Sequence, residues 1–343
     1  MKRILSFFYF YFLIGYCFAQ LGGRTIFQFL NLETAPRHAA LGGKLVTDYR
    51  NNPIAGLYNP ASINETMSGN FSVNYTNFLA DINYGSFATV YNIPRTYHTF
   101  HLGVIYINYG DFDGFDVEGN TTGTFGANEA AVSLGYGYKL PNSNFRIGAN
   151  IKAINSSLEQ YKSFGIAGDI GILYLKEEWN LNIGLSVRNI GKQLTTFADT
   201  EEDLPLEINL GISQTLQNAP VRWFLNLQNL QQYELAFTNE NRNQESNFGE
   251  GTRIDDPSFF NNILRHVNIG AELFPEKAVN IRLGFNFRRA EELKIADQRS
   301  FAGLSAGFGL KIGKLKFNYA WTRFNLVGSS NTFGLNLNFG KYQ

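Results

Sequence analysis

The four histidines could most readily do chemistry, but their spacing signals no metal site. They are His38, His98, His101 and His266. On a strand, His98 and His101 would face opposite sides of the sheet, because successive side chains alternate between the faces. The sequence has neither an H-x-x-x-H nor a C-x-x-C motif, so no metal ligand set is predicted. We therefore expect no cofactor and no enzyme activity. A hydrolase whose catalytic serine and histidine come together only in the folded structure remains an alternative functional class.

A cluster of carboxylates is the next candidate for chemistry. It comprises Asp111, Asp113, Asp116 and Glu118, around a turn expected at Asp113-Gly114. Carboxylate oxygens suit Ca²⁺, but the spacing does not fit an EF-hand loop. A solvated turn is the favoured interpretation, and a calcium site is the alternative.

Basic residues recur on the predicted inward faces of strands. They are Arg146, Lys152, Arg188, Arg222, Arg282 and Arg288. Three carboxylates, those of Asp169, Glu207 and Glu272, are expected on the same side. A cationic interior is one interpretation. Ion pairing is the favoured one, because partly buried charges need partners.

The long connection 231–262 is the best candidate for an interaction surface. It carries Tyr233, Phe237, Phe259 and Phe260 among Asn, Gln and Glu. Exposed aromatic side chains in a polar loop often anchor a protein partner. The alternative is a loop that folds over its own barrel mouth. Asp111 and Asp113 are further candidates for partner contact.

The elements that would position these residues show alternation of period two. In 331–339, Phe333, Leu335, Leu337 and Phe339 alternate with Gly and Asn. One apolar, aromatic face and one polar face are typical of a transmembrane β-barrel, although a soluble sandwich also buries aromatics. The low charged fraction, 17%, and the 31 Phe and 18 Tyr agree with a barrel.

Residues 1–19 have the features of a secretory signal peptide. Lys2 and Arg3 precede an apolar run over 4–16, and Cys17-Phe18-Ala19 offers small residues for cleavage near Ala19. No later stretch has 18 uninterrupted apolar residues. The mature chain would lack cysteine and have two more acidic than basic residues, so nothing points to nucleic acid. We predict export to the outer membrane.

The alternation predicts about 14 strands, an even number as in bacterial single-chain barrels. The expected strands are 70–79, 83–92, 97–108, 127–138, 144–154, 162–174, 180–190, 205–216, 220–230, 263–274, 279–289, 300–312, 315–324 and 331–339. With the C-terminus in the periplasm, the periplasmic turns are short and most opposite connections are longer. The predicted organisation is a signal peptide (1–19), an N-terminal segment (20–69) and an all-β, antiparallel outer-membrane barrel (70–343).

The segment 20–69 lacks clean alternation and is expected to be a plug or hatch inside the barrel. A periplasmic tail is the alternative. Thr34 to Leu41 is expected to be a short helix, with Thr34 as N-cap and Gly42-Gly43 as terminator. The plug is favoured because Phe27, Phe29, Leu30 and Leu41 need burial.

Several blocks of this sequence resemble the PorQ family of type IX secretion proteins of Bacteroidetes, within the broader FadL-like barrel class. The blocks lie at 27–32, 35–43, 58–62, 109–116, 123–127 and 150–169. Asn59 and Pro60 of the hatch motif are shared with FadL-like proteins generally. The combination with 35–43 and the aspartate loop is much more specific. One departure is the end of the chain, where Phe339 is followed by four residues.

The resemblance implies a 14-stranded barrel with an N-terminal hatch and a role that is not enzymatic. Members are thought to hold a PorZ-like surface protein and to work with PorU-like and PorV-like components in an attachment complex. That complex joins cargo to anionic lipopolysaccharide. The alternative function is a FadL-type channel for hydrophobic small molecules, although the Gly, Asn, Ser and Arg of the predicted inward faces argue against a fatty substrate.

Overall fold

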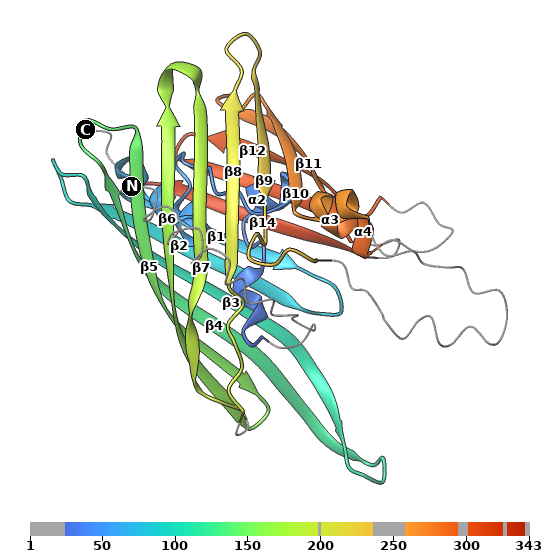
Figure 1. The fold of residues 1–343 in the computed structure, drawn as a ribbon. Coiled ribbons are helices and arrows are strands. Elements are labelled where there is room, and N and C mark those ends of the chain that lie inside the picture. The colour runs from blue at the N-terminus through green and yellow to red at the C-terminus, as the bar shows by residue number, and fades with distance from the viewer. Residues whose placement is uncertain (1–24, 198–199, 236–257, 294–300, 325–327, 340–343) are drawn as a thin grey trace, which may run out of the picture.

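The computed structural model describes residues 25–197, 200–235, 258–293, 301–324 and 328–339. These residues form a closed antiparallel barrel of fourteen strands, in which each strand pairs with its neighbours in the sequence and β1 pairs with β14 (Figure 1). The strands are β1 (Asn70–Asn77), β2 (Asn83–Asn92), β3 (His98–Phe115), β4 (Thr121–Lys139), β5 (Phe145–Leu158), β6 (Tyr161–Lys176), β7 (Leu181–Thr195), β8 (Glu207–Thr215), β9 (Val221–Leu227), β10 (Val267–Leu273), β11 (Val279–Asn286), β12 (Leu304–Ile312), β13 (Leu315–Arg323) and β14 (Ser329–Asn338).

The alternation of the sequence becomes an outward and an inward face. In β1, Phe71, Val73 and Tyr75 are exposed on the outer surface, whereas Ser72 and Thr76 are fully buried. An outer face of aliphatic and aromatic side chains is what a barrel presents to lipid. The predicted fold class and strand number are thereby confirmed.

The strands β3 to β7 are all longer than predicted, and the β3–β4 hairpin departs most from the prediction. The region 109–126 was expected to be a loop, but β3 continues to Phe115 and β4 begins at Thr121. Cross-strand pairing persists there through two register irregularities, and the hairpin extends well beyond the rest of the barrel (Figure 1). The turn lies at Asp116–Asn120 and not at Asp113-Gly114, because the Asp116 carboxylate accepts hydrogen bonds from the backbone N–H groups of Glu118 and Asn120.

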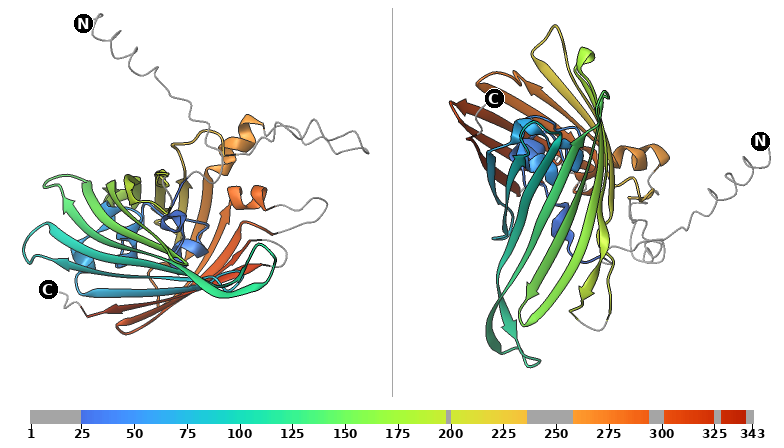
Figure 2. Two further views of the ribbon diagram at one scale, coloured as in Figure 1. Left: turned by 90° about the horizontal axis from the view of Figure 1, so that it is seen from below. Right: turned by 90° about the vertical axis from the view of Figure 1, so that its left-hand side faces the viewer.

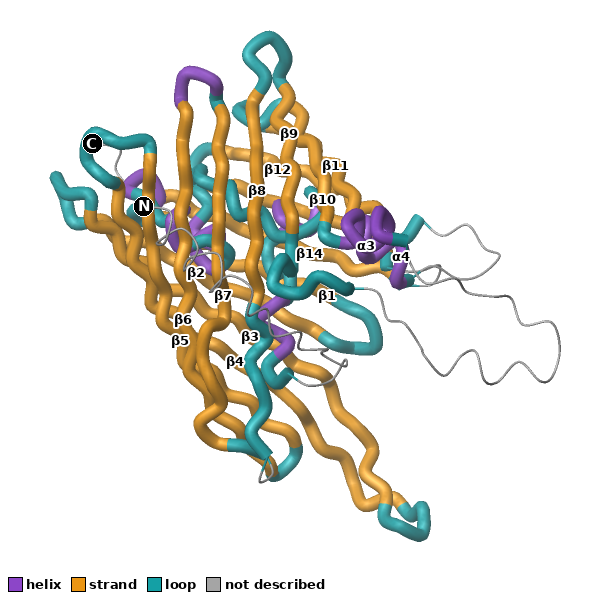
Figure 3. The backbone as a smooth tube through the Cα atoms, viewed as in Figure 1, coloured by secondary structure: helices purple, strands orange, loops and turns teal. Residues whose placement is uncertain are grey.

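Two predicted strand ends are helical instead. Residues 263–265 belong to helix α3 (Phe259–Arg265), and residues 287–289 belong to α4 (Phe287–Glu292). Each helix begins at a side-chain cap: Ser258 accepts from the N–H of Asn261, and Asn286 accepts from the N–H of Arg289. Such caps satisfy backbone donors that a strand would have paired. In Figure 3 the two helices stand out in purple beside each other at one end of the barrel.

The N-terminal segment, residues 25–69, lies within the ring of strands, as the blue ribbon in Figure 2 shows. It is built from short turns of helix: η1 (Gln28–Asn31), α2 (Pro36–Ala40), η2 (Pro53–Leu57), η3 (Pro60–Ser62) and η4 (Glu65–Met67). Phe27, Phe29, Leu30 and Leu41 are all buried, as expected. No helix in the described ranges has the length and hydropathy of a membrane-spanning helix.

Helix α2 is shorter than expected and begins differently. Its N-cap is Ala35, not Thr34, and the helix starts at Pro36, whose fixed φ suits the first helical position. The Thr34 hydroxyl instead lies 3.1 Å from the Tyr58 hydroxyl. Gly42 ends the helix with a φ of 90°, a conformation that favours glycine.

Candidate functional site

The contact between the N-terminal segment and the barrel wall is the candidate functional site. Inward-facing glycines let the two backbones touch. An added Cβ on Gly284 of β11 would lie 2.2 Å from the carbonyl carbon of Leu41 and the nitrogen of Gly42. At Gly148 of β5 the nearest atoms are the carbonyl atoms of Pro60, at 2.3 Å. No larger residue would fit at these positions without displacing the segment.

Glu272 of β10 is the centre of the first buried ion-pair network. Its carboxylate accepts from Arg37 of the segment, with Nη2 to Oε2 at 2.7 Å, and from Arg282 of β11, with Nε to Oε1 at 2.9 Å. Arg222 of β9 lies 3.7 Å away. Arg37 also pairs with Asp48. One carboxylate of the wall therefore holds three guanidinium groups, one of them from the segment.

A second network is centred on Glu207 of β8. Arg188 donates to its Oε2 at 2.6 Å, and Lys44 of the segment pairs with Oε1. Arg188 also donates to the carbonyl oxygen of Leu30, at 2.9 Å. This network joins two wall strands to two separate parts of the segment.

The predicted pairing with Asp169, Glu207 or Glu272 forms for Lys152, Arg188, Arg222 and Arg282, but not for Arg146 or Arg288. Lys152 lies 2.7 Å from Asp169, and Arg146 donates to the carbonyl oxygen of Ile63 and to Glu65, at 3.0 and 3.1 Å. Arg288 was expected to face inward, but it lies in α4 and pairs with Glu292 at 2.7 Å. The i,i+4 spacing of a helix brings that pair together.

Asn59 and Pro60 of the hatch motif are completely or almost completely buried where the segment meets β5 and β6. Asn59 Oδ1 accepts from the N–H of Ala61 at 3.0 Å, and its Nδ2 donates to the carbonyl oxygen of Val46 at 2.7 Å. The side chain therefore fixes two turns of the segment relative to each other. Asn59 Oδ1 also occupies the space that a Cβ on Gly171 of β6 would need.

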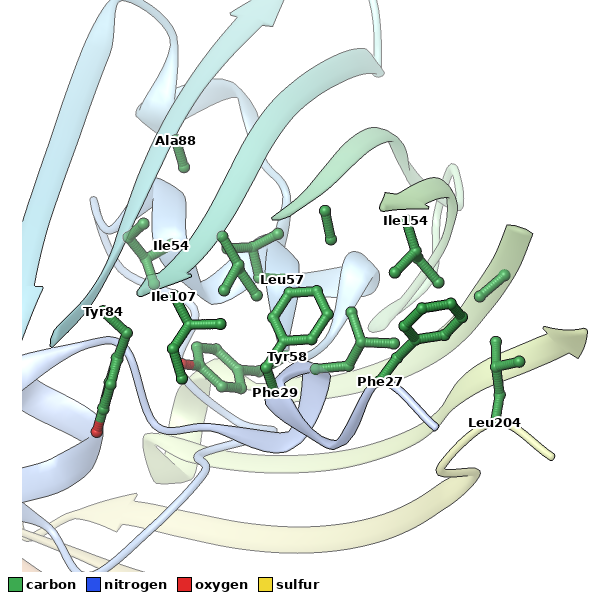
Figure 4. Packing of buried hydrophobic residues seen from close by; sticks show 14 of the residues in the cluster. Phe27, Phe29, Ile54, Leu57, Tyr58, Tyr84, Ala88, Ile107, Ile154 and Leu204 are labelled. Atoms are coloured by element: carbon green, nitrogen blue, oxygen red, sulfur yellow. The ribbon is translucent and has the colours of Figure 1, made fainter. Parts of the chain in front are cut away.

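Part of the interior is apolar, in contrast to the inward faces of Gly, Asn, Ser and Arg that the sequence predicted. Figure 4 shows Phe27, Phe29, Leu57 and Tyr58 of the segment beside Tyr84, Ile107 and Ile154 of the wall. All members of this cluster are buried. Burial of apolar surface stabilises the contact by roughly 25 cal/mol per Å². The segment is thus held by apolar packing as well as by ion pairs.

His38 is buried in the segment between Asp48 and Tyr58. Its Nε2 lies 3.2 Å from Asp48 Oδ2, and its ring centre lies 4.4 Å from that of Tyr58. The N–H of Leu45 donates to Nδ1, so a neutral ring carries its proton on Nε2 and donates it to Asp48. Burial lowers the pKa of His38, although Asp48 opposes the shift.

The lowered pKa of His38 predicts that the folded N-terminal segment becomes less stable in mild acid. The unfolded state takes up this proton near pH 6.5, whereas the folded state resists it until the pH falls further. The stabilisation is therefore complete above about 6.5 and is lost as the pH falls through the folded-state pKa. A His38→Gln variant should show a flatter dependence of the free energy of unfolding on pH over this range. An unchanged slope would contradict the assignment.

The other histidines are in structural positions. His101 is buried and lies 3.0 Å from the carbonyl oxygen of Pro53, and His98 is on the opposite face, with Nδ1 2.6 Å from the hydroxyl of Tyr136. His266 Nδ1 lies 2.7 Å from the carbonyl oxygen of Gln228. In the described part of the chain, no group of three or more His, Cys, Asp or Glu side chains is placed to hold a metal ion.

The predicted partner-contact residues lie at the end of the barrel with the longer connections. Phe259 and Phe260 of α3 are each 68% exposed, and the Tyr233 ring centre is 6.3 Å from that of Phe259. Asp111 and Asp113 are exposed on the long β3–β4 hairpin. Phe237 and the signal peptide lie outside the described residues. The sequence analysis missed the helix that presents the two phenylalanines, whose one local signal is the N-cap residue Ser258.

The comparisons with known proteins concern the fold. No protein-family model and no curated protein matches the sequence. The solved structure "TodX monoaromatic hydrocarbon channel deltaS2 mutant" is similar, with a TM-score of 0.52 and 12% identity over 90% of this chain and 100% of that chain.

Two other solved structures align less well. The KdgM porin has a TM-score of 0.31 and 8% identity over 79% of this chain and 99% of its own. LpxR from Salmonella typhimurium has a TM-score of 0.34 and 8% identity over 79% of this chain and 100% of its own. Of these three structures, TodX is similar enough for a comparison of folds. The chain therefore has the closed β-barrel fold of an outer-membrane protein, which supports a location in the outer membrane.

Proposed function

We propose that this barrel is an outer-membrane anchor for a surface protein, within a type IX secretion attachment complex. The observation that carries the proposal is the occupied interior. The N-terminal segment is joined to the wall through Glu272, Glu207 and Arg146 and through the apolar cluster around Phe29. A barrel filled in this way serves better as a rigid support than as a passage.

Opening a passage through the barrel would require the N-terminal segment to leave its contacts with the wall. Moving the segment would separate Arg37 from Glu272 and Lys44 from Glu207, both buried pairs. Removing one partner of a buried pair costs about 3–5 kcal/mol. The barrel wall itself is also continuous, since each described strand pairs with both neighbours. A lateral opening would need further broken pairing.

The proposed partner is a PorZ-like surface protein, acting with PorU-like and PorV-like components near lipopolysaccharide. The sequence resemblance suggests this partner, and the exposed Phe259 and Phe260 supply a suitable contact. Aromatic anchors of this kind contribute much of the binding energy at protein interfaces. The anchor then needs no catalytic residue or cofactor of its own.

A Phe259→Ser/Phe260→Ser variant should release the surface partner. Loss of two aromatic anchors is expected to weaken binding by about 30-fold or more, since hot-spot residues contribute 2 kcal/mol or more. The measurement is the yield of the co-purified surface protein after gentle detergent extraction from the native outer membrane.

Trp179→Ser is the matched control for that variant. Trp179 is also an exposed aromatic residue, but it lies in the short β6–β7 turn at the opposite end of the barrel. The control should retain the partner. If the double variant retains as much partner as the wild type, the contact lies elsewhere on the barrel. If the control loses as much partner as the double variant, the effect is not specific to α3.

A FadL-type channel for hydrophobic small molecules is the second candidate. The likeness to TodX favours it, as does the apolar cluster inside the barrel. Such a channel requires the N-terminal segment to move during transport. Uptake of a lipophilic solute that depends on this chain would support the channel, and retention of a surface protein would support the anchor.

A further inference from the structure

A cavity of about 270 Å³ lies inside the barrel at the end with the short turns. Its lining includes the turn at Gly313-Lys314, the turn at Pro275–Lys277 and Arg50 of the N-terminal segment. Its polar strand residues, such as Asn74 and Asn318, are on inward faces. The cavity is therefore reached from the lumen and not from the lipid-facing surface.

The lining carries far more positive than negative charge. Its basic residues are Arg37, Arg50, Arg222, Lys277, Lys311, Lys314 and Lys316, and its acidic residues are Glu272 and Glu276. Seven basic against two acidic residues leave an excess of five positive charges. Such an excess in a recess raises the local concentration of anions.

The two carboxylates are already engaged by arginines. Glu272 holds Arg37 and Arg222, and Glu276 holds Arg50 and Arg222. Among the described residues, no acidic group lies within ion-pair distance of any of the four lysines in the lining. The lysine charges are thus available to a ligand.

Lys311 and Lys316 are directly opposite each other in the register of β12 and β13. Like charges at directly opposed positions destabilise a sheet. An anion between the two ammonium groups would attract both and offset that repulsion. Asn336 faces Lys316 from β14 and offers amide donors beside it.

We propose that this cavity binds a soluble anion with more than one phosphate group. Lysine ammonium groups and arginine forks are the side chains best suited to phosphate oxygens. The charge excess matches a polyanion better than a single carboxylate. The inward orientation of the lining favours a dissolved anion over a lipid headgroup. This site is independent of the proposed surface partner at the other end of the barrel.

The test is isothermal titration of inorganic pyrophosphate into the full-length barrel in a zwitterionic detergent. We expect saturable binding with about one pyrophosphate per barrel. Lys311→Gln/Lys316→Gln should weaken it by about a hundredfold or more, because the two lost charge-assisted hydrogen bonds contribute about 1.5–3 kcal/mol each. The matched control is Lys162→Gln/Lys192→Gln, which removes two exposed lysines of β6 and β7 near the long-loop end and should bind as the wild type does.

Thermal unfolding followed by circular dichroism gives a second readout. Without pyrophosphate, the Lys311→Gln/Lys316→Gln variant should melt at or above the wild-type temperature, because the repulsion is gone. With pyrophosphate, only the wild type and the control should gain stability. No saturable binding to the wild type would overturn the proposal, as would equal weakening in both double variants. If the double variant does not fold, the single Lys311→Gln variant is compared in the same way.

Discussion

Replacing Glu272 by Gln should destabilise the barrel by about 3–5 kcal/mol, the usual cost of breaking a buried ion pair by removing one partner. Three guanidinium groups, those of Arg37, Arg222 and Arg282, would lose their shared carboxylate. Gln keeps the size of the side chain, so the effect reports charge and not packing. The measurement is the free energy of unfolding from denaturant titration in detergent micelles.

Glu178→Gln is the control for this prediction. Glu178 also pairs with a basic residue, since its carboxylate lies 2.9 Å from Lys176 Nζ, but the pair is on the surface. Exposed pairs contribute little because water and salt screen them. The control should have the same free energy of unfolding as the wild type. A loss below about 1 kcal/mol for Glu272→Gln would show that the network does not hold the segment.

Adding one methyl group at Gly284 should loosen the N-terminal segment. The Gly284→Ala side chain would overlap the backbone between Leu41 and Gly42, with contacts of 2.2 Å. Overpacking of this kind costs roughly 1–3 kcal/mol. Because the barrel strands can stay paired while the segment shifts, we expect local opening more than global unfolding.

Limited trypsin digestion measures that opening. Cleavage after Lys44 and Arg50 should become about tenfold faster in Gly284→Ala, as a change of 1.4 kcal/mol in the opening equilibrium implies. Gly168→Ala is the control, because its Cβ would meet nothing closer than 3.5 Å. Protection of Lys44 as complete as in the wild type would show that the segment is not seated against β11.

The strand pattern was predictable because a period of two follows directly from burial on one face. The sequence also predicted that inward-facing basic residues pair with Asp169, Glu207 and Glu272, as Lys152 and Arg188 do, because all these side chains are on inward faces of the strands. Strand ends were less predictable. The caps at Ser258 and Asn286 decide where helices replace strands, and the alternation across these positions gave no sign of them.

The contacts of the N-terminal segment were the least predictable part. Glu65 has no periodic context that could have joined it to Arg146, because the segment folds as irregular turns. The apolar part of the interior did leave a signal: Val104, Ile105 and Ile107 are all apolar although they include both faces of β3. A strand that is apolar on both faces indicates an interior that is itself packed with apolar residues.

Native mass spectrometry of the barrel, gently extracted from its own outer membrane, tests the anchor function most directly. We expect a dominant species with the mass of this chain plus one exported surface protein. That species should be depleted in the Phe259→Ser/Phe260→Ser variant. A barrel that carries no protein but a lipophilic small molecule would contradict the anchor and favour the channel.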